Sequence, residues 1–230
     1  MIRLLLTVLS LVIVLPTSHA QQSEPHPPQW RAQWIWLQEG EAADMMLARR
    51  VFTLTKVPER ATLAITASSR YQLYINGSYI GSGPARCAPH HQAYDVLDIA
   101  DALRAGKNAL AIRVHFQCEG VSYYGASRAG LLAQLDFPPG TDATDIQTDE
   151  SWRVAPDDSW RNESPRMAVF HLDVCDRVDL RRKIKDWAAP EFDDSGWNRG
   201  HVLRRDSGWP TPQADERPAH LVLPWTDLVP

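Results

Sequence analysis

The chain has 230 residues and a formal net charge of −4 at pH 7, so its charge argues against a nucleic-acid backbone as partner. This length fits one large domain that can bury a hydrophobic core. Seventeen Pro and twelve Gly favour many short strands joined by turns over long helices. The composition therefore points to an all-β fold.

The first 20 residues have the pattern of a secretory signal peptide. A basic start at Arg3 precedes an apolar run over residues 4–15, and small residues at 18 and 20 define a cleavage position. The alternative is an uncleaved anchor, but the apolar run is short for a membrane span. We therefore expect a secreted or periplasmic protein with no membrane association after cleavage. Residues 21–29 are polar and Pro-rich, which is typical of a linker.

From residue 30 onward, stretches rich in apolar residues recur at short intervals with turn residues between them. Several have period two, such as Tyr71, Leu73 and Ile75, which alternate with Gln72 and Tyr74, and this is typical of strands with one buried face. Asn76-Gly77 supplies the two positive-φ positions that a type I′ hairpin needs. We predict strands at residues 32–36, 47–55, 61–67, 94–99, 108–116 and 130–137, and a hairpin at 71–81.

Details of this pattern make further predictions. Val51 and Leu54 are expected in the core, and the strand at 61–67 is expected to pair with the hairpin that follows it. One helical turn is predicted at residues 99–103, and a short helix just after Pro190. Most of the nine Trp residues are expected in the core, because large aromatic side chains fill sandwich interiors.

The economical fold is a two-sheet β-sandwich over residues 30–212 with a few short helical turns. Residues 213–230 are Pro-rich and are predicted to form an extended C-terminal segment.

A set of short motifs runs in order along nearly all of the chain after residue 29. These motifs are WIW at 34–36, RVF at 50–52, LYING at 73–77, GSGP at 81–84, YDVLDI at 94–99, LRAGKN at 103–108, TDESW at 148–152, DLR at 179–181, Trp187 and FDDSGW at 192–197. The ordered set resembles the N-terminal region of bacterial α-L-rhamnosidases, which are inverting glycoside hydrolases of family 78. The resemblance implies a jelly-roll β-sandwich of the galactose-binding type.

The resemblance also implies a function. In that family the catalytic acid and base lie in a helical toroid that these motifs do not include, so no catalytic residue is expected here. We expect an exported noncatalytic sandwich domain of a truncated or split rhamnosidase-like protein. It would dock to a catalytic glycosidase domain or weakly bind a rhamnose-containing plant polysaccharide or glycoside.

Two alternatives remain open, besides an independent enzyme of unknown chemistry on this scaffold. One is an autonomous lectin-like carbohydrate-binding module. The other is the sugar-binding domain of a β-galactosidase or β-glucuronidase, where Asn-Gly hairpins and the Asp-Asp-Ser-x-Trp motif also occur. Some related sandwiches hold calcium partly through an Asp-Asn pair before the hairpin strand, and Ser69-Arg70 stands in that place here. No metal or other cofactor is therefore expected.

Two predicted loops are the best candidates for a sugar site, at residues 82–93 and 117–129. They gather hydrogen-bond donors, acceptors and stackable rings, the mixture that small-ligand sites need. The alternative is that these loops pack against a catalytic domain. The candidate carbohydrate-binding residues are Arg86, His90, His91, Gln117, Glu119, Tyr123 and Tyr124.

Cysteines and paired carboxylates offer further candidates. Cys87 and Cys118 are a candidate disulfide, because an exported chain meets oxidising conditions. Zinc-like spacing of these cysteines with His90, His91 and His115 is a second option, and unpaired thiols are a third. The neighbouring carboxylates at 157–158 and 193–194 are interpreted as turn or cap residues, since the two side chains of such a pair diverge.

Overall fold

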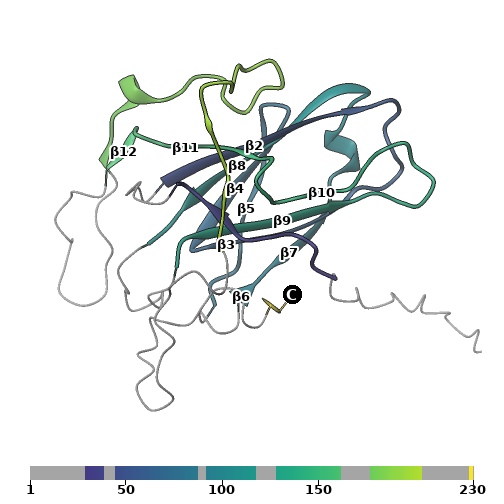
Figure 1. The fold of residues 1–230 in the computed structure, drawn as a ribbon, viewed down its shortest axis with the longest axis horizontal. Helices are drawn as coiled ribbons and strands as arrows, with labels where there is room; N and C mark the ends of the chain where they lie inside the picture. The colour runs from purple at the N-terminus through teal and green to yellow at the C-terminus, as the bar shows by residue number, and fades with distance from the viewer. Residues whose placement is uncertain are drawn as a thin grey trace, which may run out of the picture.

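The computed structural model describes residues 29–38, 45–87, 92–117, 128–161, 177–203 and 228–229. In this part of the chain, two antiparallel sheets pack face to face as a jelly-roll β-sandwich (Figure 1). The predicted all-β class is therefore confirmed. The helical segments of the described part are two short 3-10 turns, Ala100–Ala102 (η1) and Leu180–Arg182 (η2). No described helix has the length and apolarity needed to cross a membrane. The predicted signal peptide lies outside the described residues.

Sheet A has the strand order β15-β1-β9-β3-β7, with β10 also paired to β9. Its strands are β1 (Ile35–Trp36), β3 (Thr62–Ser68), β7 (Asp95–Asp98), β9 (Gly130–Asp136), β10 (Ile146–Gln147) and β15 (His201–Val202).

Sheet B has the order β14-β11-β2-β8-β4-β5. Its strands are β2 (Met45–Leu54), β4 (Arg70–Ile75), β5 (Ser78–Gly83), β8 (Gly106–His115), β11 (Arg153–Pro156) and β14 (Asn198–Arg199). Two small pairs complete the fold: β12 (Trp160–Arg161) with β13 (Arg177–Val178), and β6 (Gln92–Ala93) with β16 (Leu228–Val229).

The hydrophobic core lies between the two sheets, because alternate residues of each strand face inward. In β4 the inward set is Tyr71, Leu73 and Ile75, which the period-two pattern had identified. Trp36 and Trp152 belong to the same core cluster. Trp34 and Trp187 are also buried, so four of the described Trp residues lie inside the protein.

Two predictions about pairing and burial are wrong. Strand β3 pairs with β7 and β9 in sheet A, not with the hairpin. The chain passes to sheet B at Ser69, whose backbone N–H donates to the His115 carbonyl at 3.0 Å. Val51 is outside the core because β2 pairs regularly with β8 along its whole length. In such a strand the residues on the same face as Leu54 are even-numbered, including Phe52.

The Asn-Gly hairpin has the predicted geometry, with φ of 53° at Asn76 and 87° at Gly77. The Asn76 side chain also donates to the Ala102 carbonyl at 3.0 Å and to Asn108 Oδ1 at 2.9 Å, and it accepts from the Ala109 N–H at 2.9 Å. Asn108 is fully buried and in turn bonds the backbone of Arg104. The hairpin is therefore a structural anchor that joins β4, β8 and η1.

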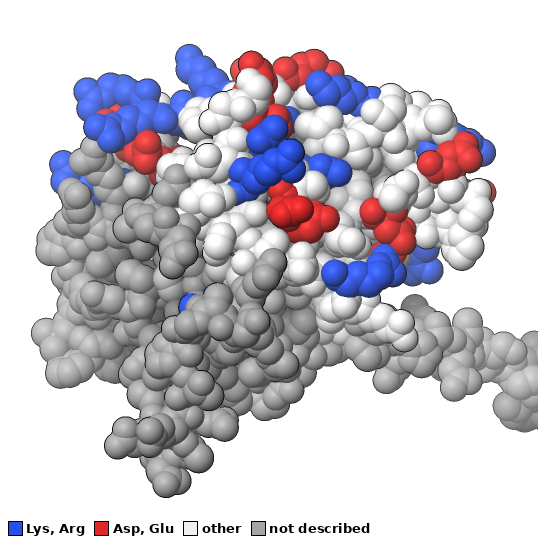
Figure 2. All heavy atoms as spheres, in the orientation of Figure 1, with Lys and Arg blue, Asp and Glu red and all other residues white. Residues whose placement is uncertain are grey.

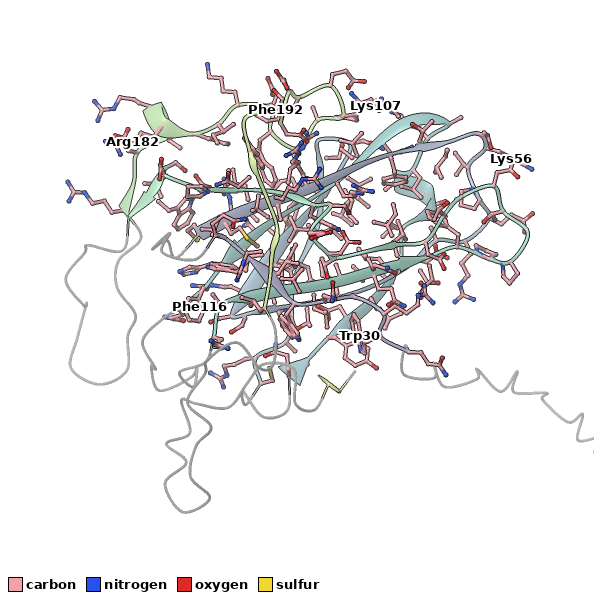
Figure 3. The ribbon with its side chains drawn as sticks, in the orientation of Figure 1. Trp30, Lys56, Lys107, Phe116, Arg182 and Phe192 are labelled. Atoms are coloured by element: carbon pink, nitrogen blue, oxygen red, sulfur yellow. The ribbon has the colours of Figure 1, made fainter. Side chains whose placement is uncertain are left out.

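Residues 184–197, here called the cover segment, lie over the outer face of sheet B, the face turned away from the core (Figure 1). Trp187 and Ala188 form a second hydrophobic cluster with Leu47 and Ala111 of that face. Figure 3 shows Phe192 on this side of the sandwich and Trp30 on the opposite side. The cover segment thus buries the part of the outer face of sheet B around Leu47 and Ala111.

Arg49 of β2 holds the cover segment in place. Its side chain is fully buried, forms an ion pair with Asp194, and donates to the carbonyls of Ala189 at 2.7 Å and Phe192 at 3.1 Å. Burial lowers the pKa of Arg49, and the Asp194 carboxylate partly offsets that effect. The predicted helix after Pro190 is wrong: separate turns replace it, closed by hydrogen bonds from the Phe192 N–H to the Ala189 carbonyl and from the Trp197 N–H to the Asp194 carbonyl.

Candidate functional site

A pocket of about 440 Å³ opens on another part of the outer face of sheet B. This volume is within the range of sites for small ligands. The residues come from four strands of sheet B (β2, β4, β5 and β8), from β12 and from the turn after β5, and we call this site the outer-face pocket. Its lining residues are Met45, Arg70, Tyr71, Gln72, Ser82, Gly83, Pro84, Arg113, His115 and Trp160.

The register of sheet B explains why these side chains lie together. Arg70 of β4 is the direct partner of His115 of β8, which in turn is the partner of Met45 of β2. One rung further along, Gln72 lies between Ser82 and Arg113. Residues directly opposite one another share a face, so two successive outward rungs form the floor of the pocket.

Arg70 and His115 are joined within the first rung. Arg70 Nε donates to His115 Nδ1 at 3.0 Å, which requires an imidazole with no proton on Nδ1. In the next rung, the Gln72 amide oxygen accepts from the Tyr74 hydroxyl at 3.3 Å. The Gln72 NH₂ group makes no hydrogen bond with the described residues and is available as a donor. The floor therefore offers polar groups in fixed positions.

Trp160 forms a wall of the pocket. Its ring lies 6.4 Å from the His115 ring, with 36° between the two planes. The backbone N–H of Trp160 donates to the Asp157 carbonyl at 3.2 Å, and the backbone N–H of Asp157 donates to the Met45 carbonyl at 3.0 Å. This turn fixes the indole, which is half-buried, beside the sheet.

Arg113 is held by the same turn. Its Nη2 atom lies 2.9 Å from Asp157 Oδ2, and both side chains are largely buried. The other carboxylate oxygen of Asp157 accepts from the backbone N–H and hydroxyl of Ser159. Asp157 thus acts in a turn, as interpreted from the sequence, and also neutralises the arginine under the pocket.

Tyr71 lines the pocket and contacts Asp95 of sheet A. The Tyr71 hydroxyl donates to Asp95 Oδ2, and burial, followed by this hydrogen bond, raises the pKa of Tyr71. Gly83 passes directly over this pair: a Cβ atom at Gly83 would lie 2.1 Å from Asp95 Oδ2. A glycine is therefore required where β5 crosses the Tyr71–Asp95 contact.

The carboxyl groups with displaced pKa values lie near residues 179 and 193. Both pKa values are lowered: that of Asp179 to about 2, chiefly by a hydrogen bond from Arg181, and that of Asp193 by hydrogen bonds from Ser195. A glycosidase acid needs a raised pKa so that it carries a proton to the leaving group. Asp193 caps a turn, as expected, whereas Asp194 neutralises the buried Arg49.

The predicted sugar-binding residues do not form the outer-face pocket. Arg86 is exposed and lies two residues after Pro84, which lines the pocket, but Arg86 itself does not line it. Gln117 is only 6% exposed and its backbone N–H donates to Ser69 Oγ at 3.2 Å. The other five candidates lie outside the described residues: His90, His91, Glu119, Tyr123 and Tyr124.

Sequence reasoning missed Arg70, Gln72, Arg113, His115 and Trp160 as residues of a sugar site, and considered His115 only as a possible zinc ligand. The signal for the first four was the same period-two alternation that identified the core, since each follows or precedes an inward-facing residue. Trp160 had no such signal, because its position depends on a turn that packs onto a strand more than 100 residues earlier.

The cysteine prediction stays a prediction. Cys87 is a free, half-buried thiol in the structure, and burial raises its pKa. Its proposed partner Cys118 lies outside the described residues. Within the described ranges, no group of three or more His, Cys, Asp or Glu side chains could hold a metal ion.

Comparisons with known proteins converge on one family. The family described as the alpha-L-rhamnosidase N-terminal domain matches residues 56–220. An alpha-L-rhamnosidase of Formosa agariphila is 28% identical over 167 residues, which make up 65% of this chain and 16% of that protein. A second one, of Streptomyces avermitilis, is 29% identical over 156 residues, 62% of this chain and 14% of that protein.

The same relationship appears among solved structures. The GH78 family rhamnosidase of Bacillus sp. GL1 superposes with a TM-score of 0.72 at 34% identity, covering 89% of this chain and 20% of that one. The chain therefore spans only 14% to 16% of the length of these two curated relatives, and a fifth of this solved structure.

Proposed function

Since the chain belongs to the family of α-L-rhamnosidase N-terminal domains, we propose that its sandwich is a noncatalytic unit that binds carbohydrate weakly in the outer-face pocket. The observation that carries the proposal is the combination of an indole wall with a floor of polar side chains. Sugar sites need a ring that stacks on the apolar face of the sugar and donors that reach its hydroxyl groups.

The residues of the pocket divide these roles. Trp160 supplies the stacking ring, and the free NH₂ group of Gln72 and the guanidinium of Arg113 supply donors. Asp157 and the sheet register hold these groups before any ligand arrives. Such preorganisation lowers the entropy lost on binding. One ring and a few donors on an open face support an affinity on the order of millimolar.

Titration calorimetry or NMR shift mapping with L-rhamnose and with a rhamnose-containing oligosaccharide tests the proposal. Trp160→Ala and Gln72→Ala should each weaken binding about tenfold, since each removes one main contact. Tyr79→Ala is the matched control, because Tyr79 is an exposed aromatic residue of sheet B, at 56%, that does not line the pocket. Wild-type protein that gives no signal with either sugar, or equal losses in all three variants, would contradict the proposal.

The noncatalytic part of the proposal has its own test. The displaced carboxyl pKa values of the described residues are lowered, so they favour ionised groups rather than proton donors. The purified chain should therefore show no turnover of a nitrophenyl rhamnoside above the buffer rate. Measurable turnover that survives repurification would show that the domain is catalytic. The titrations described above would still decide whether it binds sugar.

Docking to a catalytic glycosidase domain is a second candidate function. It is favoured by the small share of the relatives that this sandwich occupies, because in them it is joined to several hundred further residues. Leu180 and Val178, at 71% and 42% exposure, form an apolar edge suited to such a contact. Sedimentation with a separately expressed rhamnosidase catalytic domain should show a complex that Leu180→Ser weakens; free sedimentation of both components would exclude it.

A further inference from the structure

A second pocket, separate from the outer-face pocket, is lined by four arginines. It has a volume of about 230 Å³ and lies where β2, β11 and β14 meet at one edge of sheet B. Its charged residues are Arg49, Arg50, Arg153, Arg199 and Asp194. Three of these arginines, Arg49, Arg153 and Arg199, share the outer face of sheet B, whereas Arg50 follows Arg49 on β2 and points to the opposite face. Figure 2 shows basic side chains grouped near the centre of the visible face, close to where the 198–203 segment crosses the sandwich in Figure 1.

The sheet register forces three of these arginines together. Arg49 of β2 is the direct partner of Arg153 of β11, and Arg153 is the direct partner of Arg199 of β14. Direct partners share a face of the sheet and lie close together, and like charges in such positions repel one another. A rung of three arginines across three adjacent strands is therefore unfavourable unless negative charge lies over it.

The protein supplies too little negative charge to compensate. Asp194 is the partner of Arg49, and this ion pair serves the cover segment. Arg153 Nη1 donates to the Trp197 carbonyl at 3.2 Å, and Arg50 Nη1 donates to the Ser151 carbonyl at 3.0 Å. These carbonyls orient the guanidinium groups without neutralising them. Among the described residues, Arg50, Arg153 and Arg199 have no carboxylate partner.

We propose that this arginine pocket binds the carboxylate group of a small acidic ligand, either a uronic acid or a simple organic acid. The planar guanidinium fork matches a carboxylate with two parallel hydrogen bonds, and Asp194 shows that the pocket already accommodates a carboxylate on Arg49. The pocket has no aromatic wall, so recognition rests on charge rather than on ring stacking. The site is independent of the sugar pocket proposed above.

Calorimetry or NMR shift mapping of the full chain at low ionic strength tests this, with D-galacturonate, acetate, D-galactose, sulfate and a hexaglutamate peptide as probes. Galacturonate should bind, and galactose should give neither the binding heat nor the NMR shift changes that galacturonate gives. Tighter binding of galacturonate than of acetate identifies a uronic acid as the ligand, and equal binding identifies the bare carboxylate. Arg199→Gln and Arg153→Gln should each weaken binding about tenfold, because each removes a charge-assisted hydrogen bond.

Arg60→Gln is the control, since Arg60 is an exposed arginine, 72% in its side chain, that lines neither pocket. Trp160→Ala should leave galacturonate binding at the arginine pocket unchanged, which separates this site from the sugar site. The proposal is overturned if galacturonate fails to bind, if galactose binds equally well, or if Arg60→Gln costs as much as Arg199→Gln. Binding of sulfate alone would also reject the proposal. Binding of a hexaglutamate peptide alone would reject it in favour of an acidic protein partner.

Discussion

Gly83 illustrates how single residues of this domain are constrained by contacts between sheets. The residue is in β5 of sheet B, yet the atom that would clash with a side chain there is Asp95 Oδ2 of sheet A. Nothing in the local pattern of β5 predicts this, since the φ of Gly83 is not positive and the preceding residues of the strand are exposed or half-buried. The restriction comes from tertiary structure alone.

Replacing Gly83 by Ala should destabilise the domain by about 1–3 kcal/mol, because the new methyl group must displace a carboxylate and the Tyr71 ring. Urea unfolding measures the loss. Gly81→Ala is the matched control in the same strand, where a Cβ would meet nothing within 4 Å. Equal stability of the two variants would show that the Tyr71–Asp95 contact is easily rearranged.

At the scale of elements, the cover segment is the part of the fold that departs most from the sequence pattern. It has no regular secondary structure between residues 184 and 197, and its position depends on Trp187 and on the buried Arg49. The neighbouring carboxylates 193 and 194 have different roles there. Asp193 accepts from the Ser195 N–H at 3.0 Å, whereas Asp194 neutralises Arg49.

Asp194→Asn should cost about 3–5 kcal/mol of folding free energy, because it leaves the guanidinium of Arg49 buried without a counter-charge. Asp193→Asn, one residue away and at an exposed turn, should cost far less. Chemical unfolding of the two variants side by side gives the comparison. A small loss for Asp194→Asn would mean that the carbonyls of Ala189 and Phe192 suffice to hold Arg49.

At the scale of the whole molecule, the Tyr71–Asp95 hydrogen bond links the two sheets, since Tyr71 belongs to β4 and Asp95 to β7. A further link is at Gly200, where the chain passes from the edge of sheet B (β14) to the edge of sheet A (β15). There the Gly200 N–H donates to the Trp152 carbonyl at 2.9 Å. Both links join strands from distant parts of the sequence.

The Tyr71 link predicts a loss of stability in alkaline solution. The pKa of Tyr71 is raised in the folded state, so the unfolded chain ionises first, near pH 10. The stabilisation is fully present below about pH 10 and decreases as the pH rises from there towards the folded pKa. Tyr71→Phe should therefore flatten the fall of the melting temperature between about pH 9.5 and 11.5.

Tyr79→Phe, at an exposed position, serves as the control for this titration. It should keep most of the wild-type dependence on pH, because Tyr79 makes the smallest of the contributions that raise the pKa of Tyr71. If Tyr71→Phe retains the full alkaline loss, the loss arises from other groups, of which the buried Tyr94, whose pKa is also raised by burial, is one.

Two features depend only on residues that are close together in the sequence: the alternation of side chains along a strand and the conformation of the Asn76-Gly77 turn. Backbone sterics and the pleat act over about two to four residues. For that reason the sequence alone determined the all-β class, the hairpin, the inward set of β4 and the family resemblance. It also predicted that Asp193 belongs to a turn.

Pairing between distant strands has no local signature, and only the tertiary structure decided it. The chain passes from sheet A to sheet B at Ser69, so β3 lies in sheet A and the hairpin lies in sheet B. Because β2 pairs regularly with β8, Val51 faces away from the core. The sequence predicted a sugar site in two loops. In the structure, the register of sheet B instead brings the outward residues of β4 and β8 together beside Trp160. The pairing of strands determines which side chains lie together in a site. Burial of the whole core determines that pairing.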